Sequence, residues 1–384
     1  MEAVLTPAQR ERRAQARAFA ARTLRPAAAD WDRQQRIPDD LLRELGRQGF
    51  FGATLPEAAG GGGWDAVSFG LLHEAIGRED SAVAGFLTIQ AMVAAALNKW
   101  GSPAQKERWL PGLARGETLA SFALTEPGAG SDLPGLRTAL APDGAGGFRL
   151  RGEKKWISGA QHSHLFLVFA QSDGGPAACL VPRGAPGFRI EPIRELMGFR
   201  AAGLGRLSFE DVPVAAADLV GRPGFGFSHV APVGLHWGRL STACSAAGLL
   251  RGCAEESGAH AARRDIGGHP AADLGMVQTL IARQAADAEA AQWLCWSACA
   301  AEDRRDPEAY LRAFVAKYFA SRAAVRAAAD AVQVHGAAGV HESAPVSRYY
   351  RAAKIMEIIE GTTQVHESVI ARAFVRRESA SAAG

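Results

Sequence analysis

One carboxylate near the end of the chain stands at a glycine-marked break between two helical patterns. Residues 347–359 carry apolar side chains at helical spacing, and a second amphipathic pattern covers 365–374, where Thr362 or Thr363 can cap its start. Glu360 is therefore expected at a corner between two helices. Burial among the neighbouring isoleucines would raise its pKa toward the range in which a carboxylate works as a base near neutral pH. A solvated glutamate before a turn is the alternative interpretation.

A second segment, residues 122–132, combines hydroxyl side chains with a proline and two glycines. Gly128 and Gly130 would let backbone amides approach a planar ligand, so this segment is a candidate cofactor loop. It is not a dinucleotide fingerprint, because Leu133 stands where a third glycine is needed and no βαβ pattern surrounds it. A structural turn is the alternative.

Trp156 and Ser158 lie beside a β pattern, where an aromatic ring and a hydroxyl could cover a ring system. A tryptophan in the core of a sheet is the alternative. Arg239 and Arg264 belong to a set of arginines that could contact anionic ligand groups, although an arginine taken singly is more often a solvated or helix-capping side chain.

The histidines and cysteines do not form a metal-binding pattern. His162 and His164 alternate near an expected strand start, but the sequence has no HExxH motif and no carboxylate set beside them. Cys295 and Cys299 share a helix face without a third and fourth soft ligand. We therefore predict no metal site. The sequence also lacks the GxSxG and GxxxxGK[ST] motifs of common serine hydrolases and P-loop nucleotidases.

Composition limits the classes of partner. The 384 residues carry 43 basic and 40 acidic side chains, a net charge of +3, which indicates neither a nucleic-acid footprint nor a membrane-surface patch. We expect a cytoplasmic protein, because no apolar leader and no stretch of 18 uninterrupted apolar residues is present. The five cysteines are expected to be buried thiols of a reducing compartment.

The wider pattern predicts an α+β multidomain protein. Capping boxes begin at Thr6 and Ser102 in a helical first part, residues 1–116. Short alternating runs without intervening helices predict a middle β domain, a barrel or sandwich, over 117–228. A carboxy-terminal bundle of several long helices is predicted over 229–384, with one long helix capped by Asp306 and ended at Gly336, and with residues 379–384 frayed.

In order and spacing, several segments together resemble the acyl-CoA dehydrogenase family, flavoproteins with a helical amino-terminal domain, a middle β domain and a carboxy-terminal four-helix bundle. The resemblance covers nearly the whole chain. Its motifs lie at residues 56–57 with the following glycines, 105–111, 125–132, 156–158, 209–212, 333–336 and 360–362.

The resemblance implies that the chain binds FAD and forms a homodimer or homotetramer. Residues implied to bind FAD within one subunit are Phe122, Leu124, Thr125, Gly130, Ser131, Trp156, Ile157 and Ser158, with Thr362 and Gln364 at the diphosphate end. Residues implied to reach the FAD of a neighbouring subunit are Arg264, Gln333, Val334, Gly336 and Ala337.

The resemblance also implies the chemistry. Glu360 would remove the pro-R α-proton of an acyl thioester while a β-hydride passes to flavin N5. The Glu360 amide and a flavin ribityl hydroxyl would polarise the thioester carbonyl. Arg239, Ser131 and Gly361 would contact the substrate. An electron-transfer flavoprotein or a similar acceptor would take the electrons.

The sequence departs from the family pattern at several positions. In the stretch implied to face a neighbouring subunit, Gly267 stands where the family usually has an aromatic residue and Gly275 where it usually has a glutamine. The sequence also differs from the family pattern around the expected site, at Ala202, Leu204, Ile359 and Ala352. These changes favour a small or polar acyl group, carried either by CoA or by an acyl-carrier protein. Two rival functions stay open, a flavin-dependent oxidase or monooxygenase on the same fold and a non-catalytic, DNA-associated flavin protein.

Overall fold

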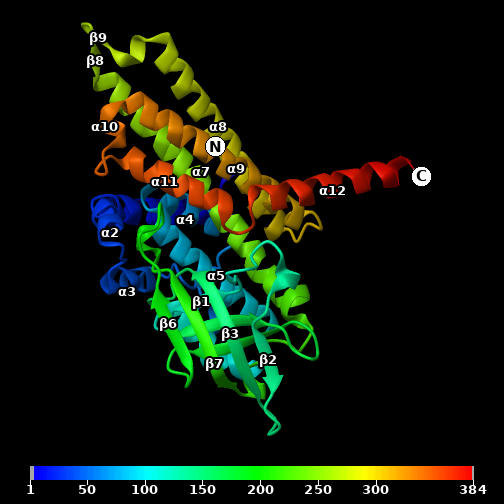
Figure 1. Cartoon of the computed structure of the whole chain (residues 1–384). Coiled ribbons are helices and arrows are strands. Elements are labelled where there is room, and N and C mark those ends of the chain that lie inside the picture. Colours follow the sequence, from blue (N-terminus) through cyan, green and yellow to red (C-terminus); the bar gives the residue numbers. More distant parts are fainter. Residues whose placement is uncertain (1–3, 383–384) are drawn as a thin grey trace.

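The computed structural model describes residues 4–382 and consists of amino-terminal helices, a middle β domain and carboxy-terminal helices (Figure 1). The predicted fold class is confirmed. The predicted domain limits at 116/117 and 228/229 stay predictions, and the outermost residues of those domains, 1–3 and 383–384, lie outside the described part of the chain.

Six α-helices build the amino-terminal part. Their bounds are α1 Pro7–Phe19, extended by a π-turn Ala20–Leu24, α2 Ala28–Gln34, α3 Asp39–Arg47, α4 Ala66–Glu79, α5 Ser81–Trp100 and α6 Pro103–Arg115. Both predicted capping boxes are confirmed, at Thr6 before α1 and at Ser102 before α6. Helix α5 is long and apolar enough to cross a bilayer, but 83% of that stretch is buried inside the fold, as in a core helix.

The middle domain is a sandwich of two sheets. The strands are β1 Ala120–Ala123, β2 Ala139–Pro142, β3 Phe148–Ile157, β4 Leu165–Ala170, β5 Ala177–Pro182, β6 Phe188–Pro192 and β7 Gly205–Val214. One sheet has the order β1-β4-β5, with β1 parallel to β4, and the other has the order β2-β3-β7-β6 and is antiparallel. Inward residues of both sheets, such as Leu150, Phe166 and Leu207, form a separate core.

Long helices form the carboxy-terminal part. After a π-turn at Gly226–Val230, the elements are α7 Ala231–Arg263, β8 Asp265–Ile266, β9 His269–Pro270, α8 Gly275–Asp303, α9 Ala309–His335, α10 Ala337–Val340, α11 Pro345–Ile358 and α12 Thr363–Ala382. Helices α7, α8, α9 and α11 pack as the bundle. The predicted start of α9 at Asp306 is wrong, because Asp306 accepts the amide of Glu308 in a turn and the helix begins at Ala309.

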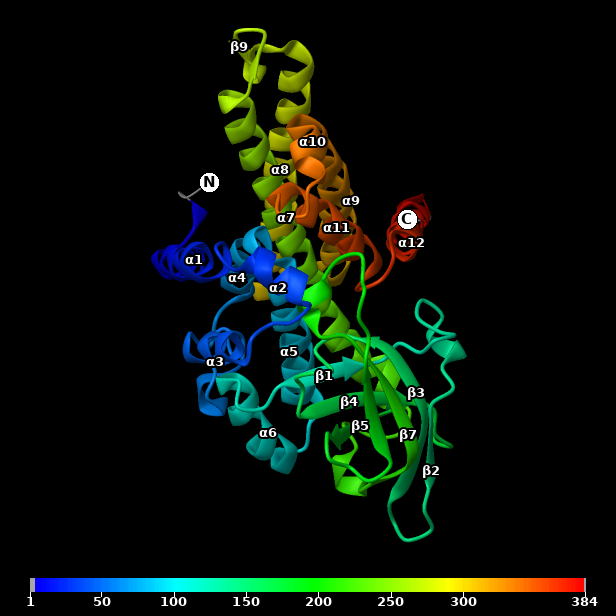
Figure 2. The same ribbon diagram turned by 60° about the vertical axis from the view of Figure 1, so that its left-hand side comes forward.

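Short 3-10 turns connect these elements, at Glu57–Ala59, Leu133–Gly135, Arg200–Ala202, Ala216–Asp218 and Ala271–Asp273. Helix α12 leaves the body of the molecule as an arm, which the rotated view shows nearly end-on (Figure 2). Because α12 is helical through Ala382, the predicted fraying is wrong for residues 379–382, and residues 383–384 lie outside the described part.

Candidate active site

Glu360 occupies the predicted corner between α11 and α12. Helix α11 ends at Ile358, Ile359 is extended, and Glu360 and Gly361 have φ angles of 55° and 95°. A non-glycine residue with φ above zero is uncommon and is kept only where the surrounding structure determines it. This left-handed turn directs the Glu360 side chain into the protein instead of along the helix.

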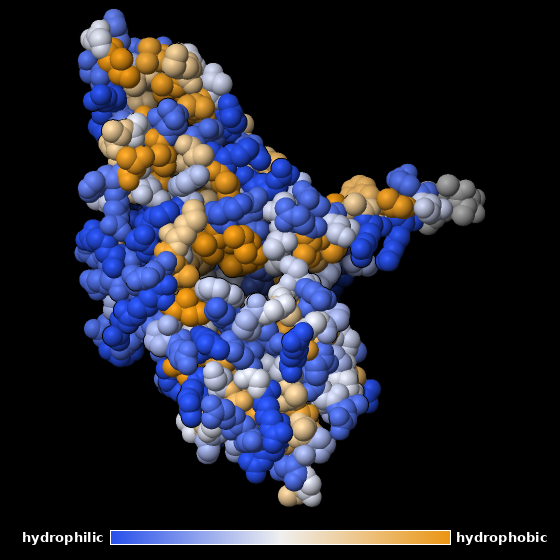
Figure 3. All heavy atoms as spheres, in the orientation of Figure 1, coloured by the Kyte–Doolittle hydropathy of each residue, from blue (hydrophilic) through white to orange (hydrophobic). Residues whose placement is uncertain are grey.

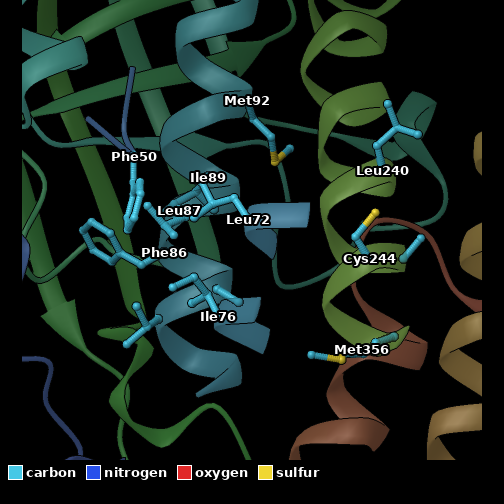
Figure 4. Close-up of a cluster of buried hydrophobic side chains, with 14 of the residues drawn as sticks. Phe50, Leu72, Ile76, Phe86, Leu87, Ile89, Met92, Leu240, Cys244 and Met356 are labelled. Atoms are coloured by element: carbon cyan, nitrogen blue, oxygen red, sulfur yellow. The ribbon is translucent and has the colours of Figure 1, made fainter. Parts of the chain in front are cut away.

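The Glu360 carboxylate packs against α7 and α5. At Gly238 of α7 a Cβ atom would lie 2.2 Å from Glu360 Oε2 and 3.0 Å from Met92 Sδ, so only glycine leaves room for the carboxylate. Met92 of α5 points toward α7 in the close-up of the core (Figure 4). Of the isoleucines expected around Glu360, Ile355 and Ile359 are partly buried against the core, whereas Ile358 is 51% exposed. The expectation did not include the contacts from α5 and α7.

Burial raises the pKa of Glu360 to about 7, while the cations Arg239 and Lys317 act in the opposite direction. Its Oε2 atom is buried and has no hydrogen-bond partner among the residues that the structure describes. An unsatisfied buried carboxylate oxygen is expensive to keep unless a ligand or substrate completes the site. Its geometry and its pKa suit a general base near neutral pH.

Arg239 of α7 is held in an aromatic cage. It is buried, donates from Nη1 to the Tyr310 hydroxyl at 3.0 Å, and places its guanidinium 4.2 Å from the centre of the Phe314 ring. Contact with aromatic faces stabilises a desolvated cation. Arg239 is therefore a fixed positive charge near Glu360, and not the solvated arginine of the alternative interpretation.

Tyr310 also lines a cavity of about 470 Å³ that opens beside α5, α7 and the α8–α9 connection. His236 and Glu302 form a pair on its wall, with Nε2 2.8 Å from Oε2, and this hydrogen bond holds the pKa of Glu302 below its ordinary value. A larger cavity, of about 1330 Å³, lies between α3 and residues 161–164, and none of the predicted site residues lines it.

The second predicted segment meets the strand of Trp156. The amide of Lys155 donates to the carbonyl of Thr125 at 2.9 Å, which brings the 122–131 loop beside the end of β3. Trp156 has a φ of 62° and is 48% exposed, so the alternative of a core tryptophan is wrong. The half-buried Ser158 and the half-buried Thr125 flank it.

The other residues of this segment divide into buried and open positions. Phe122, Leu124 and Ile157 are buried, whereas Gly130 and Ser131 are exposed. The structure therefore places an open aromatic ring beside an exposed glycine-containing loop. Hydrophobic surface also gathers where the bundle meets the β domain (Figure 3). An exposed aromatic ring beside open backbone is typical of a binding site.

A buried ion pair supports this loop from behind, which the sequence analysis missed. Lys154 Nζ lies 2.8 Å from Glu126 Oε1 and donates to the Leu124 carbonyl at 2.9 Å. Burial would raise the pKa of Glu126, but hydrogen bonds from Lys154 and Thr138 hold it below its ordinary value. Glu126 and Lys154 thus position the loop and do not face the open side.

The residues predicted to reach a neighbouring subunit lie at the far tip of the bundle, remote from Trp156 in both views (Figures 1 and 2). Arg264 follows α7 and is exposed. Gln333, Val334, Gly336 and Ala337 span the end of α9 and the start of α10. His260 of α7 stacks on His335 of α9 with ring centres 4.2 Å apart, which joins these two groups.

The glycine at position 267 has a local cause. Gly267 and Gly268 have φ angles of 65° and 88° and form the two-residue turn between β8 and β9. A turn with both central residues at positive φ favours glycine and disfavours an aromatic side chain. Gly275 opens α8 and Ala352 is buried in α11.

The remaining predicted residues lie near Glu360 or on open loops. The carbonyl of Gly361 accepts from Lys317, and the carbonyl of Thr362 accepts from His366 Nδ1 at 3.0 Å. Gln364 is exposed in the first turn of α12. Among residues 4–382, no group of three or more potential ligands could hold a metal ion. All five cysteines are free and buried, as predicted.

Lys317, Gly238 and Met92 are site residues that sequence reasoning missed. Lys317 carries a usable signal, because it interrupts the small-residue face of α9 that includes the buried Ala313, Ala316 and Ala320. A lysine on a buried face needs partners. Gly238 and Met92 carry no such signal, since their role depends on how α5 and α7 meet.

Models of known domains match almost the whole chain. They are the acyl-CoA dehydrogenase N-terminal domain over residues 6–117, the middle domain over 121–212 and the C-terminal domain over 224–375. An acyl-CoA dehydrogenase of Bacillus subtilis (strain 168) is 33% identical over 362 residues, which are 93% of this chain and 95% of that protein.

Two further proteins are similar over nearly their full length. The acryloyl-CoA reductase (NADH) of Anaerotignum propionicum is 34% identical over 383 residues, 98% of this chain and 97% of that protein. The structure of butyryl-CoA dehydrogenase from Megasphaera elsdenii has a TM-score of 0.93 at 31% identity and covers 97% of this chain and 99% of its own. The chain therefore belongs to the acyl-CoA dehydrogenase family, whose enzymes are oxidoreductases acting on CH–CH bonds.

Proposed function

We propose that this protein is an FAD-dependent α,β-dehydrogenase of an acyl thioester, with Glu360 as the base. One observation carries the proposal: Glu360 stands on a strained turn with a buried, unpartnered Oε2 atom and a pKa near 7. Such a group can accept the α-proton of a thioester, and it has no evident structural purpose.

The chain's residues fit FAD, on which the family depends. The exposed ring of Trp156 and the Thr125 to Ser131 loop offer a cover and open backbone for a planar ring system. Thr362 and Gln364, at the start of the 20-residue helix α12, would meet its diphosphate. When bound, FAD supplies the acceptor for the β-hydride.

The other steps, which are proton abstraction and substrate binding, fall to residues of this chain. Glu360 takes the α-proton, and its backbone amide polarises the thioester carbonyl, which makes that proton acidic. Arg239 offers a fixed cation near the thioester. Gly361 and Ser131 are placed at the substrate by family resemblance, and Ser131 is exposed enough for that contact.

The three similar proteins described above have CoA compounds in their names, which supports a CoA thioester, and a carrier-protein thioester is the alternative substrate. The polar cavity wall at His236 and Glu302 is compatible with a small or polar acyl group. An electron-transfer flavoprotein or similar acceptor, a homodimer or homotetramer, and a cytoplasmic location complete the proposal.

Anaerobic titration of the purified flavoprotein with a panel of acyl-CoAs and acyl-carrier-protein thioesters tests this function. We expect one thioester class to bleach the oxidised flavin band, and Glu360→Gln to slow the bleaching at least about 10²-fold, the contribution of a general base. Glu357→Gln is the matched control, since that carboxylate lies three residues away and pairs with Lys354 at 2.5 Å. A bound flavin that no thioester bleaches, or a Glu360→Gln variant as fast as wild type, would refute the proposal.

A further inference from the structure

Lys317 is a fully buried cation that the proposed reaction does not use. It lies on α9 with 0% of its surface exposed. Its Nζ donates to the carbonyl of Gly361 at 2.7 Å and to the carbonyl of Glu357 at 3.3 Å. These two carbonyls flank Glu360, one from the last turn of α11 and the other from the strained turn itself.

The contacts of Lys317 match a specific need of this turn. The last carbonyls of a helix have no partners within the helix, and a cation near that end interacts favourably with them. Here the two accepting carbonyls belong to residues before and after Glu360, which has a positive φ angle. Removing the ammonium would leave both carbonyls of this half-buried turn without this donor.

Other titratable groups face Lys317 from the turn and from three helices. Glu360 and Glu357 act on it from the turn and α11, and Arg239 acts on it from α7. From α12, His366 is neutral at physiological pH, because burial lowers its pKa to about 4. Burial lowers the pKa of Lys317 to about 7 and the Glu360 carboxylate opposes that shift, so the two groups stabilise each other's charged forms.

We propose that Lys317 is a positioning residue for Glu360: its ammonium clamps the turn through the carbonyls of Glu357 and Gly361 and provides the cation that favours the ionised carboxylate. The inference deepens the proposed function and rests on Glu360 as its base. Lys317 would act through Glu360 and not by contact with the thioester or the flavin.

The test measures the ionisation of Glu360 directly, so that it does not depend on turnover. The carboxyl stretching band of Glu360, identified by its loss in Glu360→Gln, is titrated by infrared spectroscopy in wild type, Lys317→Met and Lys317→Arg. We expect Lys317→Met to raise the titration midpoint by about one pH unit, the size of a lost neighbouring charge. Lys317→Arg, which keeps the charge, should restore most of the difference.

Lys354→Met is the matched control. Lys354 is a half-exposed lysine on the same helix end, paired with Glu357 and not with Glu360. Its removal should leave the midpoint within a few tenths of a unit, as expected for a surface pair. An unchanged midpoint in a folded Lys317→Met variant would overturn the inference, and so would an equal shift in Lys354→Met.

A second measurement covers the case in which Lys317→Met does not fold. Coupling between two sites is reciprocal, so Glu360→Gln, which is isosteric, should lower the midpoint at which the Lys317 ε-carbon resonance titrates. No change in that midpoint would also refute the inference. If flavin bleaching by thioesters fails while both midpoints move as stated, the proposed function fails and the role of Lys317 stands.

The kinetic consequence is specific to positioning. A rise of about one unit from a midpoint near 7 reduces the ionised fraction at pH 7 about fivefold, and the loss disappears at pH 9. A merely destabilised Lys317→Met enzyme would lose rate at every pH.

Discussion

Glu360 is a residue at which stability and function oppose each other. A glutamate at positive φ with a buried, unpaired carboxylate oxygen is unfavourable twice, through backbone strain and through desolvation. Lys317 and Arg239 compensate part of this cost by charge. A surface glutamate would be more stable in this turn but could not hold its proton near neutral pH.

The raised pKa of Glu360 makes a prediction about folding stability. Because its folded pKa of about 7 lies above its ordinary 4.5, the folded protein keeps a proton that the unfolded chain has already released. Wild-type stability should therefore fall as the pH rises from about 4.5 to about 7, and the full loss persists above that window. Glutamine does not ionise, so Glu360→Gln should escape this loss.

We expect Glu360→Gln to be more stable than wild type by about 1–3 kcal/mol at pH 8. The lower end of this range applies if the variant also loses the favourable interaction between the carboxylate and Lys317. At pH 4.5 the two proteins should be nearly equal. Chemical denaturation of the flavin-free proteins at both pH values measures this. A pH-independent difference would show that the pKa of Glu360 is not raised in the folded state.

At this scale the sequence predicted the position of Glu360 but not its environment. The glycine and threonines after it mark the corner between helices, which local residue preferences determine. Its burial depends on Gly238 and Met92, which approach from helices more than 100 residues earlier in the chain. Such contacts have no local pattern, so the sequence indicated the neighbouring isoleucines but not these two helices.

Two glycines of helix α7 allow the β domain and Glu360 to pack closely against it. A Cβ atom at Gly234 would lie 2.5 Å from the Phe122 ring of β1, and one at Gly238 would collide with Glu360. Glycine in a helix interior is unfavourable by about 1 kcal/mol relative to alanine, so these positions indicate close approach. Helix α7 thus seats both the β domain and the candidate base.

This arrangement predicts opposite effects for two identical substitutions on one helix. Gly238→Ala should displace the Glu360 carboxylate, destabilise the fold by about 1–3 kcal/mol and slow flavin reduction by thioester. Gly258→Ala, where a Cβ atom meets nothing within 4 Å, should instead stabilise α7 by about 0.5–1 kcal/mol. Thermal unfolding and stopped-flow reduction measure both. Equal effects of the two variants would contradict the packing described here.

The start of a helix could be predicted where a side chain caps the helix. The prediction failed where the side chain caps only a turn. Thr6 and Ser102 have a reciprocal glutamine three residues later, and both helices start as predicted. Asp306 has no such partner, and its carboxylate accepts the amide of Glu308 in the turn before the helix, which begins at Ala309. Trp156 was open to two interpretations because a β-strand pattern does not reveal a residue at positive φ, which turns the ring outward.

For the whole molecule, the described chain holds two groups of predicted cofactor residues that do not meet. Trp156 and the 122–131 loop lie at the β domain, whereas Arg264 and the end of α9 lie at the opposite tip of the bundle (Figure 1). One FAD within one chain cannot contact both groups. If both bind FAD, the tip must serve the FAD of a second copy, which makes cofactor binding depend on assembly.

Arg264→Glu tests this dependence, with Arg263→Glu as its matched control on the adjacent exposed residue. We expect Arg264→Glu to lower FAD affinity about tenfold or more, the loss of a charged hydrogen bond to an anionic group, while Arg263→Glu retains FAD. Sedimentation of wild type should give a dimer or tetramer, and the flavin content should fall as dilution dissociates it. A monomer that keeps its full FAD would refute a shared site, and it would leave Arg264 without a role in cofactor binding.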